Sequence, residues 1–429
     1  MNTKPYASTM LKFHPLVAAL FLAGGATSAF ATNGYFSHGY GMKAKGMGGA
    51  SVAMTDNAFA GANNPAIAAW AGNRVELGVD VFMPKRGMER TGGTALGAIS
   101  VDSDSNSFLV PEFGYNQAIS NQLGVGITVY GNGGMNTDYA GGQVNCGAGF
   151  RNVLCGTGRL GIDLQQLIVA PTVAYKFSDS HSFGVSPLLV KQIFKADGLQ
   201  NFSGLSSASA NLTNNGTDSS SGFGVRLGYL GKLNDQFAVG ASYSPKIAMS
   251  KFSQYAGLFA DAGGFDIPEN YALGLNFQAT PNVTLAVDYE RIIYSGVPSI
   301  ANASTSTAQL GTASGRGFGW SDISVVKVGV QWKASQNLVM RAGVNVGENP
   351  VKSRDVTFNI IAPGVVTTHY TFGGTYAMSD KSEVTLSYMI APSNSVTGSS
   401  LFNSLGSSSG NETISMSQQA IGIQFGWKF

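Results

Sequence analysis

The chain has 429 residues, which suffices for two or three soluble domains or for one large β-architecture. Charged residues account for only 12% of the sequence, about half the usual globular share, and this excludes the highly charged kind of disorder. The 57 glycines indicate many tight turns and smooth strand faces. A net charge of +2 without a basic cluster argues against nucleic acid as a partner.

The first element in chain order is an expected export signal at residues 1–31. Two lysines form a positive start, and the short apolar run Pro15–Gly25 follows. Ala29 and Ala31 then offer small residues for cleavage, which we expect before Thr32. The apolar run is too short for a membrane anchor, and no later stretch approaches the roughly 20 apolar residues of a spanning helix. If the mature chain crosses a membrane, strands must do it.

The second element, residues 32–73, is rich in glycine and alanine and shows no alternation of apolar and polar residues. About forty residues therefore precede the first predicted strand, which lies in the barrel predicted below. A wide barrel leaves room in its lumen that side chains alone would not fill. We expect this segment to lie inside that lumen as a plug, which we call the hatch.

From residue 74 onward, segments of strand length alternate with period two. In Leu123–Tyr130, for example, positions 123, 125, 127 and 129 are apolar, whereas the positions between them are glycine or threonine. Such a strand can present one face to lipid and the other to a lumen. With boundaries accurate to about 2–4 residues, the fourteen candidates are 74–83, 107–115, 123–130, 164–177, 181–194, 222–230, 237–249, 270–278, 283–293, 324–332, 338–346, 367–377, 382–390 and 417–429.

The connections between these strands alternate between short and long. The short ones are 116–122, 178–180, 231–236, 279–282, 333–337 and 378–381. The long ones are 84–106, 131–163, 195–221, 250–269, 294–323, 347–366 and 391–416. This sorting, with an even strand number, is typical of outer-membrane barrels, and a soluble sandwich has no reason for it. We therefore predict an all-β fold, a 14-stranded antiparallel transmembrane β-barrel over residues 74–429, in the bacterial outer membrane.

The last strand ends with apolar residues at alternate positions and finishes on Phe429. Because unpaired backbone groups in hydrocarbon cost several kcal/mol each, this strand must close the barrel and show its apolar face to membrane lipid. We expect the barrel-assembly machinery to act on this strand. In the long connection 131–163, Cys146 and Cys155 are nine positions apart and are expected to form a local disulfide. No further metal-binding residue lies close by, so neither a metal nor another cofactor is expected.

Several motifs have a specific counterpart in a known family. Within the hatch they are Gly-x-Gly-x-Lys at Gly39–Lys43, a GGASVA run and an NNPAI run. The most recognisable is the triplet Asn64, Pro65 and Ala66. Further matches are Met135–Gly142, Gly257–Pro268, Gly319–Val330, Arg341–Val351 and the terminal Phe429. With these motifs, essentially the whole mature chain resembles the FadL family, outer-membrane transporters of long-chain fatty acids and other hydrophobic compounds.

The resemblance implies a route for the ligand. Relatives take it first into an apolar groove between two outer loops, then into an interior pocket, and release it sideways through a gap made by an inward kink in the third strand. Gly131, Gly133 and Gly134 occupy the matching region, although a plain Gly-rich turn is the alternative. N-terminal residues plug the pocket in some relatives, and Tyr35 and Phe36 are the nearest apolar candidates here.

Two sets of residues are candidates for ligand binding. Phe252, Tyr255, Leu258 and Phe259 are spaced to share one helical face, which would form an apolar landing site; ordinary loop packing is the alternative. Inside the barrel a carboxylate would need a charge-assisted donor. Of the two basic residues implicated in the family, one corresponds to Arg316, unless Arg316 is a solvated loop charge. The other falls near Gly198, with Lys195 three residues earlier.

Two further functions compete with this interpretation. Catalysis is disfavoured because the G-x-S-x-G pattern at 406–410 lies in a Ser-rich loop without the strand-to-helix elbow that the motif requires; no catalytic residue is predicted. A general diffusion porin would need an open lumen rather than a plug. We expect passive uptake of long-chain fatty acids or similar hydrophobic molecules, with monoaromatic hydrocarbons as the alternative ligands.

Overall fold

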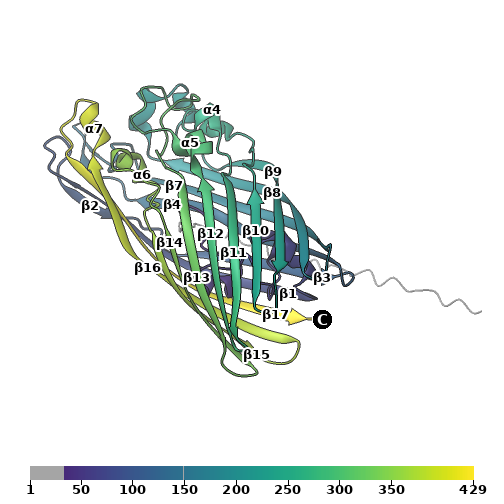
Figure 1. Cartoon of the computed structure of the whole chain (residues 1–429). Helices are drawn as coiled ribbons and strands as arrows, with labels where there is room; N and C mark the ends of the chain where they lie inside the picture. Colours follow the sequence, from purple (N-terminus) through teal and green to yellow (C-terminus); the bar gives the residue numbers. More distant parts are fainter. Residues whose placement is uncertain (1–32, 148) are drawn as a thin grey trace, which may run out of the picture.

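The computed structural model describes residues 33–147 and 149–429, so the expected export signal at 1–31 lies outside the described residues. Fourteen strands form one closed antiparallel barrel, as the alternation predicts (Figure 1). In ring order they are β1 (Arg74–Thr91), β3 (Phe108–Ala118), β4 (Leu123–Tyr139), β7 (Leu160–Lys176), β8 (His181–Asp197), β9 (Asp218–Lys232), β10 (Phe237–Ser244), β11 (Glu269–Thr280), β12 (Val283–Ile293), β13 (Ile323–Lys333), β14 (Leu338–Gly347), β15 (Thr368–Ala377), β16 (Ser382–Ser399) and β17 (Asn411–Lys428). A short strand, β2 (Ile99–Asp102), pairs with β1 outside this ring.

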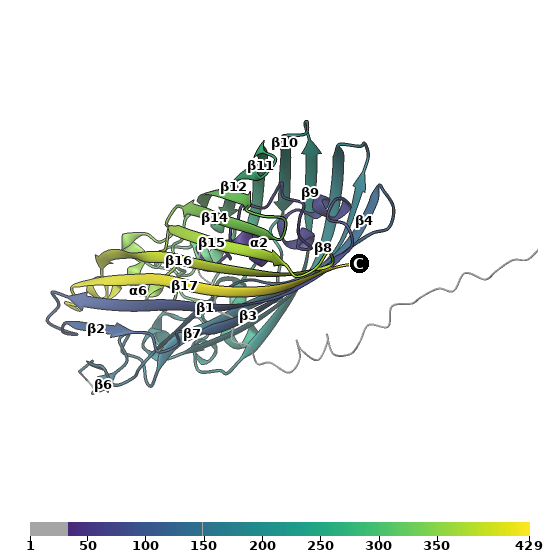
Figure 2. The ribbon, with the colours of Figure 1, turned by 90° about the horizontal axis from the view of Figure 1, so that it is seen from below.

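The ring closes between its first and last strands, which lie side by side in Figure 2. Their ladder runs from Arg74↔Lys428 to Thr91↔Asn411. On β17 the apolar parity faces outward, and Phe425 and Trp427 are 55% and 53% exposed, whereas Gln424 faces the lumen and is 1% exposed. The outward face of the closing strand is therefore apolar, as a lipid-facing strand requires.

Several strands extend further than their alternation indicates. β1 reaches Thr91, β4 reaches Tyr139 and β16 reaches Ser399. In these extensions the apolar outward face gives way to polar residues, so the period-two signal fades although the backbone ladder continues. The predicted strand 237–249 ends early, at Ser244, because Pro245 follows and has no backbone N–H for a ladder bond.

The connections sort to opposite ends of the barrel. The short turns and the C-terminus lie at one end, here called the turn end, and the long connections lie at the other, the loop end (Figure 1). The long connections carry β5 (Val144–Asn145), β6 (Phe150–Arg151), η2 (Gln200–Leu205), η3 (Ser209–Asn211), η4 (Ser253–Tyr255), α4 (Ala260–Gly263), η5 (Tyr294–Gly296), α5 (Pro298–Ala301), η6 (Ser353–Asp355), α6 (Val356–Asn359) and α7 (Leu401–Ser404). Among the described residues, no helix is both long enough and apolar enough to cross a bilayer.

Residues 33–73, the described part of the expected hatch, pack inside the barrel (Figure 2). They contain α2 (Met42–Lys45), α3 (Ala60–Asn63) and η1 (Pro65–Ala69). From residue 33 to residue 71 no residue is more than partly exposed. α2 contacts β15, β16 and β17, while η1 contacts β7, β8 and β9, so the segment reaches opposite walls of the lumen.

Candidate functional site

Two lysines of α2 fix the hatch to the barrel wall. Lys45 Nζ lies 3.0 Å from Asp80 Oδ2 on β1 and 2.7 Å from Glu112 Oε1 on β3. Lys43 Nζ lies 3.1 Å from Glu76 Oε1 on β1. Lys45 and its two carboxylate partners are at most 5% exposed at their side chains. Such buried pairs hold only because each charge has a partner, so they fix the position of α2.

The other hatch motifs are held by hydrogen bonds to the wall. The Oδ1 atom of Asn64 accepts a bond from the Ala66 N–H and caps η1, whose first residue is Pro65. The Asn64 amide also donates to the carbonyls of Val52 and Tyr229 at 2.7 and 2.8 Å. The Asn-Pro-Ala triplet therefore both starts a 3₁₀ turn and ties it to the hatch and to β9.

An apolar cavity lies at the loop end, between the barrel rim and the long connections. The space among its lining atoms is about 510 Å³ with open solvent included, of which about 40 Å³ admits the centre of a water-sized sphere. Of the predicted ligand-binding residues, Leu258, Phe259 and Arg316 line it together. Its other lining residues are Leu154, Ile162, Phe194, Leu199, Phe202, Leu212, Ser299, Leu310, Gly317, Phe318, Phe358 and Ile361. Arg316 is thus the one charged side chain among them.

The guanidinium of Arg316 has no carboxylate partner among the ion pairs of residues 33–147 and 149–429. Its Nη1 atom donates a 2.6 Å hydrogen bond to the carbonyl of Ser304. Partial burial lowers the pKa of Arg316 from its ordinary value, because apolar surroundings disfavour a charge. An anionic group placed beside it would regain part of that lost solvation.

The predicted helical face does not exist as one helix. The segment forms η4, and the short element α4 has left-handed backbone, with φ of 53° at Asp261 and 56° at Ala262. The predicted residues still converge, because Phe194 of β8 gathers them: its ring centroid lies 5.6 Å from Phe252, 4.8 Å from Tyr255 and 4.6 Å from Phe259. Phe252 and Tyr255 are fully buried behind the cavity wall and do not form an exposed landing site.

Lys195 does not belong to this cavity. It follows Phe194 on β8, so strand parity turns its side chain to the outer face of the barrel. There it forms a 2.6 Å ion pair with Asp197, and its side chain is 46% exposed. Lys195 therefore lies outside this cavity, and Gly198, which directly follows β8, offers no side chain in its place.

Tyr35 and Phe36 occupy an aromatic cage directly beneath the cavity. The Tyr35 ring lies 5.6 Å from Tyr294, 6.2 Å from Phe265 and 6.2 Å from Trp320, centroid to centroid. The Tyr294 hydroxyl donates to the carbonyl of Asn33 at 2.6 Å. Phe265 and Trp320 in turn contact Phe259 and Phe318 of the cavity, at 4.9 and 6.2 Å. The cage and the cavity thus share a wall of two aromatic rings.

The glycine-rich segment lies within β4 and not in a turn. The ladder of β4 with β7 pairs Gly131 with Leu167 and Gly133 with Gln166, so Asn132 is an extra residue, a β-bulge. The carbonyl of Asn132 accepts a bond from the Ser37 N–H, and the Gly134 N–H donates to the Tyr35 carbonyl. A Cβ at Gly133 would overlap that same Tyr35 carbonyl. The bulge therefore receives the N-terminal segment on the lumen side.

The same bulge lies beside a break in the barrel wall. β3 and β4 pair only from Ala118↔Gly124 to Phe113↔Val129. Before Phe113, β3 pairs with β1 alone, and β4 beyond Val129 pairs with β7. Within the described ranges, these two strands form no ladder with each other over that stretch, and Phe36 of the hatch bridges to Gly133 on β4 instead. The wall between β3 and β4 is thus unzipped next to Tyr35 and Phe36.

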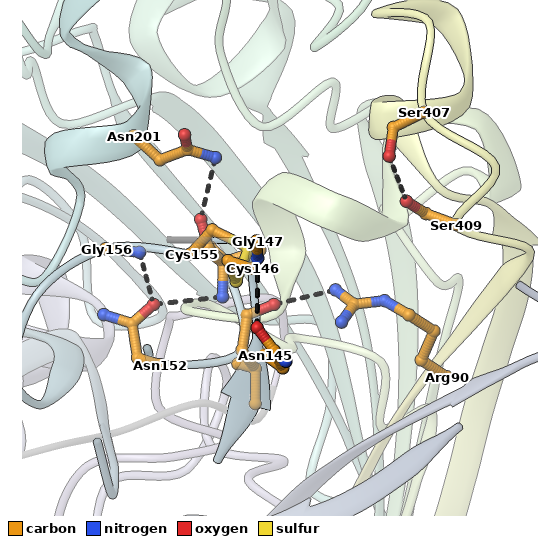
Figure 3. The surroundings of a disulfide bond; sticks show 12 residues. Arg90, Asn145, Cys146, Gly147, Asn152, Cys155, Gly156, Asn201, Ser407 and Ser409 are labelled. Atoms are coloured by element: carbon orange, nitrogen blue, oxygen red, sulfur yellow. Dashed lines mark hydrogen bonds between the residues drawn. A yellow bond between two sulfur atoms is a disulfide. The ribbon is translucent and has the colours of Figure 1, made fainter. Parts of the chain in front are cut away.

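A disulfide braces the connection that covers the cavity (Figure 3). Cys146 and Cys155 are joined across the β5–β6 hairpin. Leu154, next to the second cysteine, lines the cavity, and its carbonyl accepts a bond from the Asn201 amide. The carbonyl of Val153 accepts a 2.8 Å bond from Arg90, which is itself ion-paired with Glu412 at 2.6 Å in full burial. The roof of the cavity is therefore fixed to β1 and β17.

The sequence analysis did not predict the acidic side chains that face the lumen or the aromatic cage around Tyr35. Glu76 and Asp80 alternate with the outward Leu77 and Val79 on β1, so parity could have placed them in the lumen opposite the lysines of the hatch. The cage residues come from connections far apart in sequence, and no local pattern joins them. No group of three or more His, Cys, Asp and Glu suited to a metal occurs in the described part of the chain.

The comparisons with known proteins agree with this architecture. The family model described as outer membrane protein transport protein (OMPP1/FadL/TodX) matches residues 19–429. Among solved structures, the chain is similar to the toluene transporter TodX of P. putida, with 20% identity, TM-score 0.65 and coverage of 91% of this chain and 99% of that chain. A FadL homologue of Pseudomonas aeruginosa has 13% identity, TM-score 0.68 and coverage of 92% and 100%.

The toluene transporter TbuX of Ralstonia pickettii is also similar, with 18% identity, TM-score 0.65 and coverage of 91% and 99%. At such identities the likeness to solved structures concerns the fold. The comparison with curated proteins gives no match. Because the family model matches nearly the whole chain, the chain belongs to the OMPP1/FadL/TodX family of outer-membrane transport proteins.

Proposed function

We propose that the protein takes up long-chain fatty acids, or similarly apolar molecules that carry an anionic head group, across the outer membrane by passive diffusion. The observation that supports this most is the single unpaired cation, Arg316, in a cavity that is otherwise almost wholly apolar. Apolar walls favour the hydrocarbon body, and a guanidinium without a carboxylate partner favours an anionic head. The ligand is a hydrophobic small molecule, and no cofactor takes part.

The route begins at the loop end, which we place outside the cell. Phe265 and Trp320 lie between a ligand in the cavity and Tyr35 of the aromatic cage. To advance it must displace Tyr35 and Phe36, whose rings fill that cage. Backbone contacts join this segment to β4 beside Asn132, so displacement of the two residues exposes the bulge there. The unzipped wall between β3 and β4 then offers a lateral exit into the membrane.

Three further assignments complete the proposal. Residues 1–31 are a cleaved export signal, residues 32–73 are the hatch, and residues 74–429 are the barrel. The outward apolar faces of strands such as β17 contact outer-membrane lipid. The strand that ends at Phe429 is the segment on which the barrel-assembly machinery acts.

A closed lumen distinguishes this function from that of a general porin. The hatch residues 33–71 are buried against several walls of the barrel. We therefore expect liposomes that contain the purified protein to swell no faster in a small neutral sugar than empty liposomes do. An open porin in parallel liposomes serves as the positive control. Sugar-driven swelling at the rate of that control would mean that the lumen is open, and the transporter proposal would fail.

Monoaromatic hydrocarbons are the second candidate ligands. The aromatic cage around Tyr35 suits a flat apolar ring, and two similar solved structures are described as toluene transporters. An uncharged hydrocarbon does not need a cation in the cavity, whereas the carboxylate of a fatty acid does. Uptake of oleate and of toluene by a strain that lacks the gene, with and without the protein supplied, separates the two candidates.

Replacing Arg316 with glutamine gives a direct test. Loss of one charge-assisted hydrogen bond costs about 1.5–3 kcal/mol, so we expect oleate binding to weaken by about tenfold or more. Toluene binding should not change, because toluene has no charge to lose. The matched control is Arg159→Gln, an exposed arginine of a neighbouring connection that pairs with Asp104 and Asp138. Equal oleate affinity in wild type and Arg316→Gln would refute the fatty-acid assignment.

A further inference from the structure

A short turn in the connection between β14 and β15 holds the segment that carries Arg316. The turn consists of η6 and α6; Asp355 is the last residue of η6, and Asn359, the last residue of α6, lies one helical turn further on. Both are fully buried. Between them they reach Ser304 and the segment 316–320, which belong to a different connection, the one between β12 and β13. We call Asp355 and Asn359 the loop clamp.

Asp355 organises the polar end of the cavity. Its Oδ1 atom accepts hydrogen bonds from both the backbone N–H and the hydroxyl of Ser304, each at 2.8 Å. Its Oδ2 atom accepts a 2.9 Å bond from Arg354. The carboxylate also lies against Gly319, which has a φ of 71° and has no room for a Cβ there. A buried carboxylate with these partners keeps Ser304 in one position.

The fixed position of Ser304 in turn orients Arg316. The carbonyl of Ser304 accepts the 2.6 Å hydrogen bond from Nη1 of Arg316, a residue that lines the cavity, so this bond fixes the orientation of the guanidinium. Without it, a long side chain on a connection would sample several rotamers, and each costs ordering entropy when a ligand binds. Asp355 does not touch the cavity itself, since it is absent from its lining. Its influence on a ligand therefore runs through Ser304.

Asn359 organises the apolar end. Its Oδ1 atom accepts a 2.6 Å bond from the indole N–H of Trp320. Its amide donates 2.7 and 2.8 Å bonds to the carbonyls of Phe318 and Asp355. Phe318 lines the cavity, and Trp320 belongs to the wall that the cavity shares with the cage. One amide side chain thus fixes two aromatic residues and joins them to Asp355.

We propose that the loop clamp determines ligand specificity: Asp355 positions Arg316 for an anionic head group, and Asn359 positions the aromatic wall for the hydrocarbon body. This inference rests on the proposed function, because it assumes that Arg316 binds a carboxylate. Asp355 and Asn359 are positioning residues and not ligand contacts. The two ends of the site are consequently set by one turn of a neighbouring connection, and the clamp can be altered without changing any residue that touches the ligand's head group.

The test compares oleate with methyl oleate, its uncharged ester, by their dissociation constants for the purified protein in detergent. Replacing Asp355 with alanine removes the Oδ1 atom that accepts both hydrogen bonds from Ser304, and we expect oleate to bind about tenfold more weakly, the value of one bond to a charged group. Methyl oleate should bind as in wild type. Asp355→Asn keeps one acceptor oxygen for Ser304 and should restore most of the oleate affinity. Asn359→Ala should weaken both ligands.

Glu348→Gln is the matched control, because Glu348 is an exposed carboxylate of the same connection, paired with Arg291. It should change neither dissociation constant. Suppose that the wild type prefers oleate and that Arg316→Gln abolishes this preference. Unchanged oleate binding in Asp355→Ala would then overturn the role of the clamp and leave the proposed function intact. Equal loss of both ligands in Asp355→Ala also overturns it, because the role is then merely structural. A wild type that does not distinguish the two ligands refutes the proposed function itself.

Discussion

Deleting Asn132 is expected to reduce oleate uptake by about tenfold or more, because a barrier raised by only 1.4 kcal/mol has that effect. Asn132 is the extra residue of the bulge in β4. Without it, Gly131 and Gly133 become neighbours opposite Leu167 and Gln166, and the ladder becomes regular. The straightened strand would lie along β3, and the lateral gap would close.

The deletion should leave the barrel folded. A normal one-residue deletion turns every later side chain to the opposite face of a strand. In β4 the bulge has already shifted the alternation by one residue. Tyr130 before it and Met135 after it are an odd number of positions apart, yet both face the lumen. Removing the extra residue preserves the inward positions on both sides. Heat-modifiable mobility on a gel measures folding, and uptake of labelled oleate by a strain lacking the gene measures transport.

Asn132→Ala is the control, since it keeps the extra residue and loses only its side-chain hydrogen bonds, one donated to Gln166 and one accepted from the Tyr40 hydroxyl. It should transport at a rate close to that of the wild type. If the deletion variant is folded and takes up oleate normally, the ligand leaves by another route, and the lateral exit must be abandoned.

Replacing Lys45 with methionine is expected to lower the free energy of unfolding by about 3–5 kcal/mol, because it leaves buried carboxylates without a cation. Asp80 and Glu112 both lose their partner in a site that is almost fully enclosed. The hatch should loosen before the barrel does, since the barrel ladder is untouched. Denaturant unfolding in detergent measures the stability, and tryptic cleavage after Lys43 measures exposure of the hatch.

The matched control combines Lys45→Met with Asp80→Asn and Glu112→Gln. It removes the charges together, and the uncharged trio should recover most of the lost stability, since a neutral replacement of a buried ion pair is often tolerated. The Gln carbonyl can still accept the bond that the Gly41 N–H now gives to Glu112. Wild-type stability and protease resistance in Lys45→Met would show that these ion pairs do not hold the hatch.

The sequence predicted the barrel well because period-two alternation is enforced by lipid. In the membrane each outward residue must be apolar, so a strand such as β13 can be recognised from Val326 and Val328 alone. At the loop end this constraint ceases. The extensions of β1, β4 and β16 are held by backbone bonds between polar residues, which alternation does not reveal.

The site was only partly predictable for a related reason. Arg316, Phe259 and Leu258 were found from motif and spacing, and they do meet. The same reasoning put Lys195 in the site because proximity in sequence was counted without strand parity, which separates it from Phe194. The loop clamp joins two connections through Ser304 and Trp320. Such contacts depend on how distant loops fold over one another, and no local pattern records them.

The ion pairs of the two α2 lysines affect how the barrel closes between β17 and β1. Their carboxylate partners project from β1, β3 and β16, on both sides of the junction where β17 meets β1. A slip of one position at that junction would turn acidic groups of β1 into hydrocarbon and take one of its two carboxylate partners from each lysine. The N-terminal segment thereby favours the correct register between β17 and β1 over a shifted one.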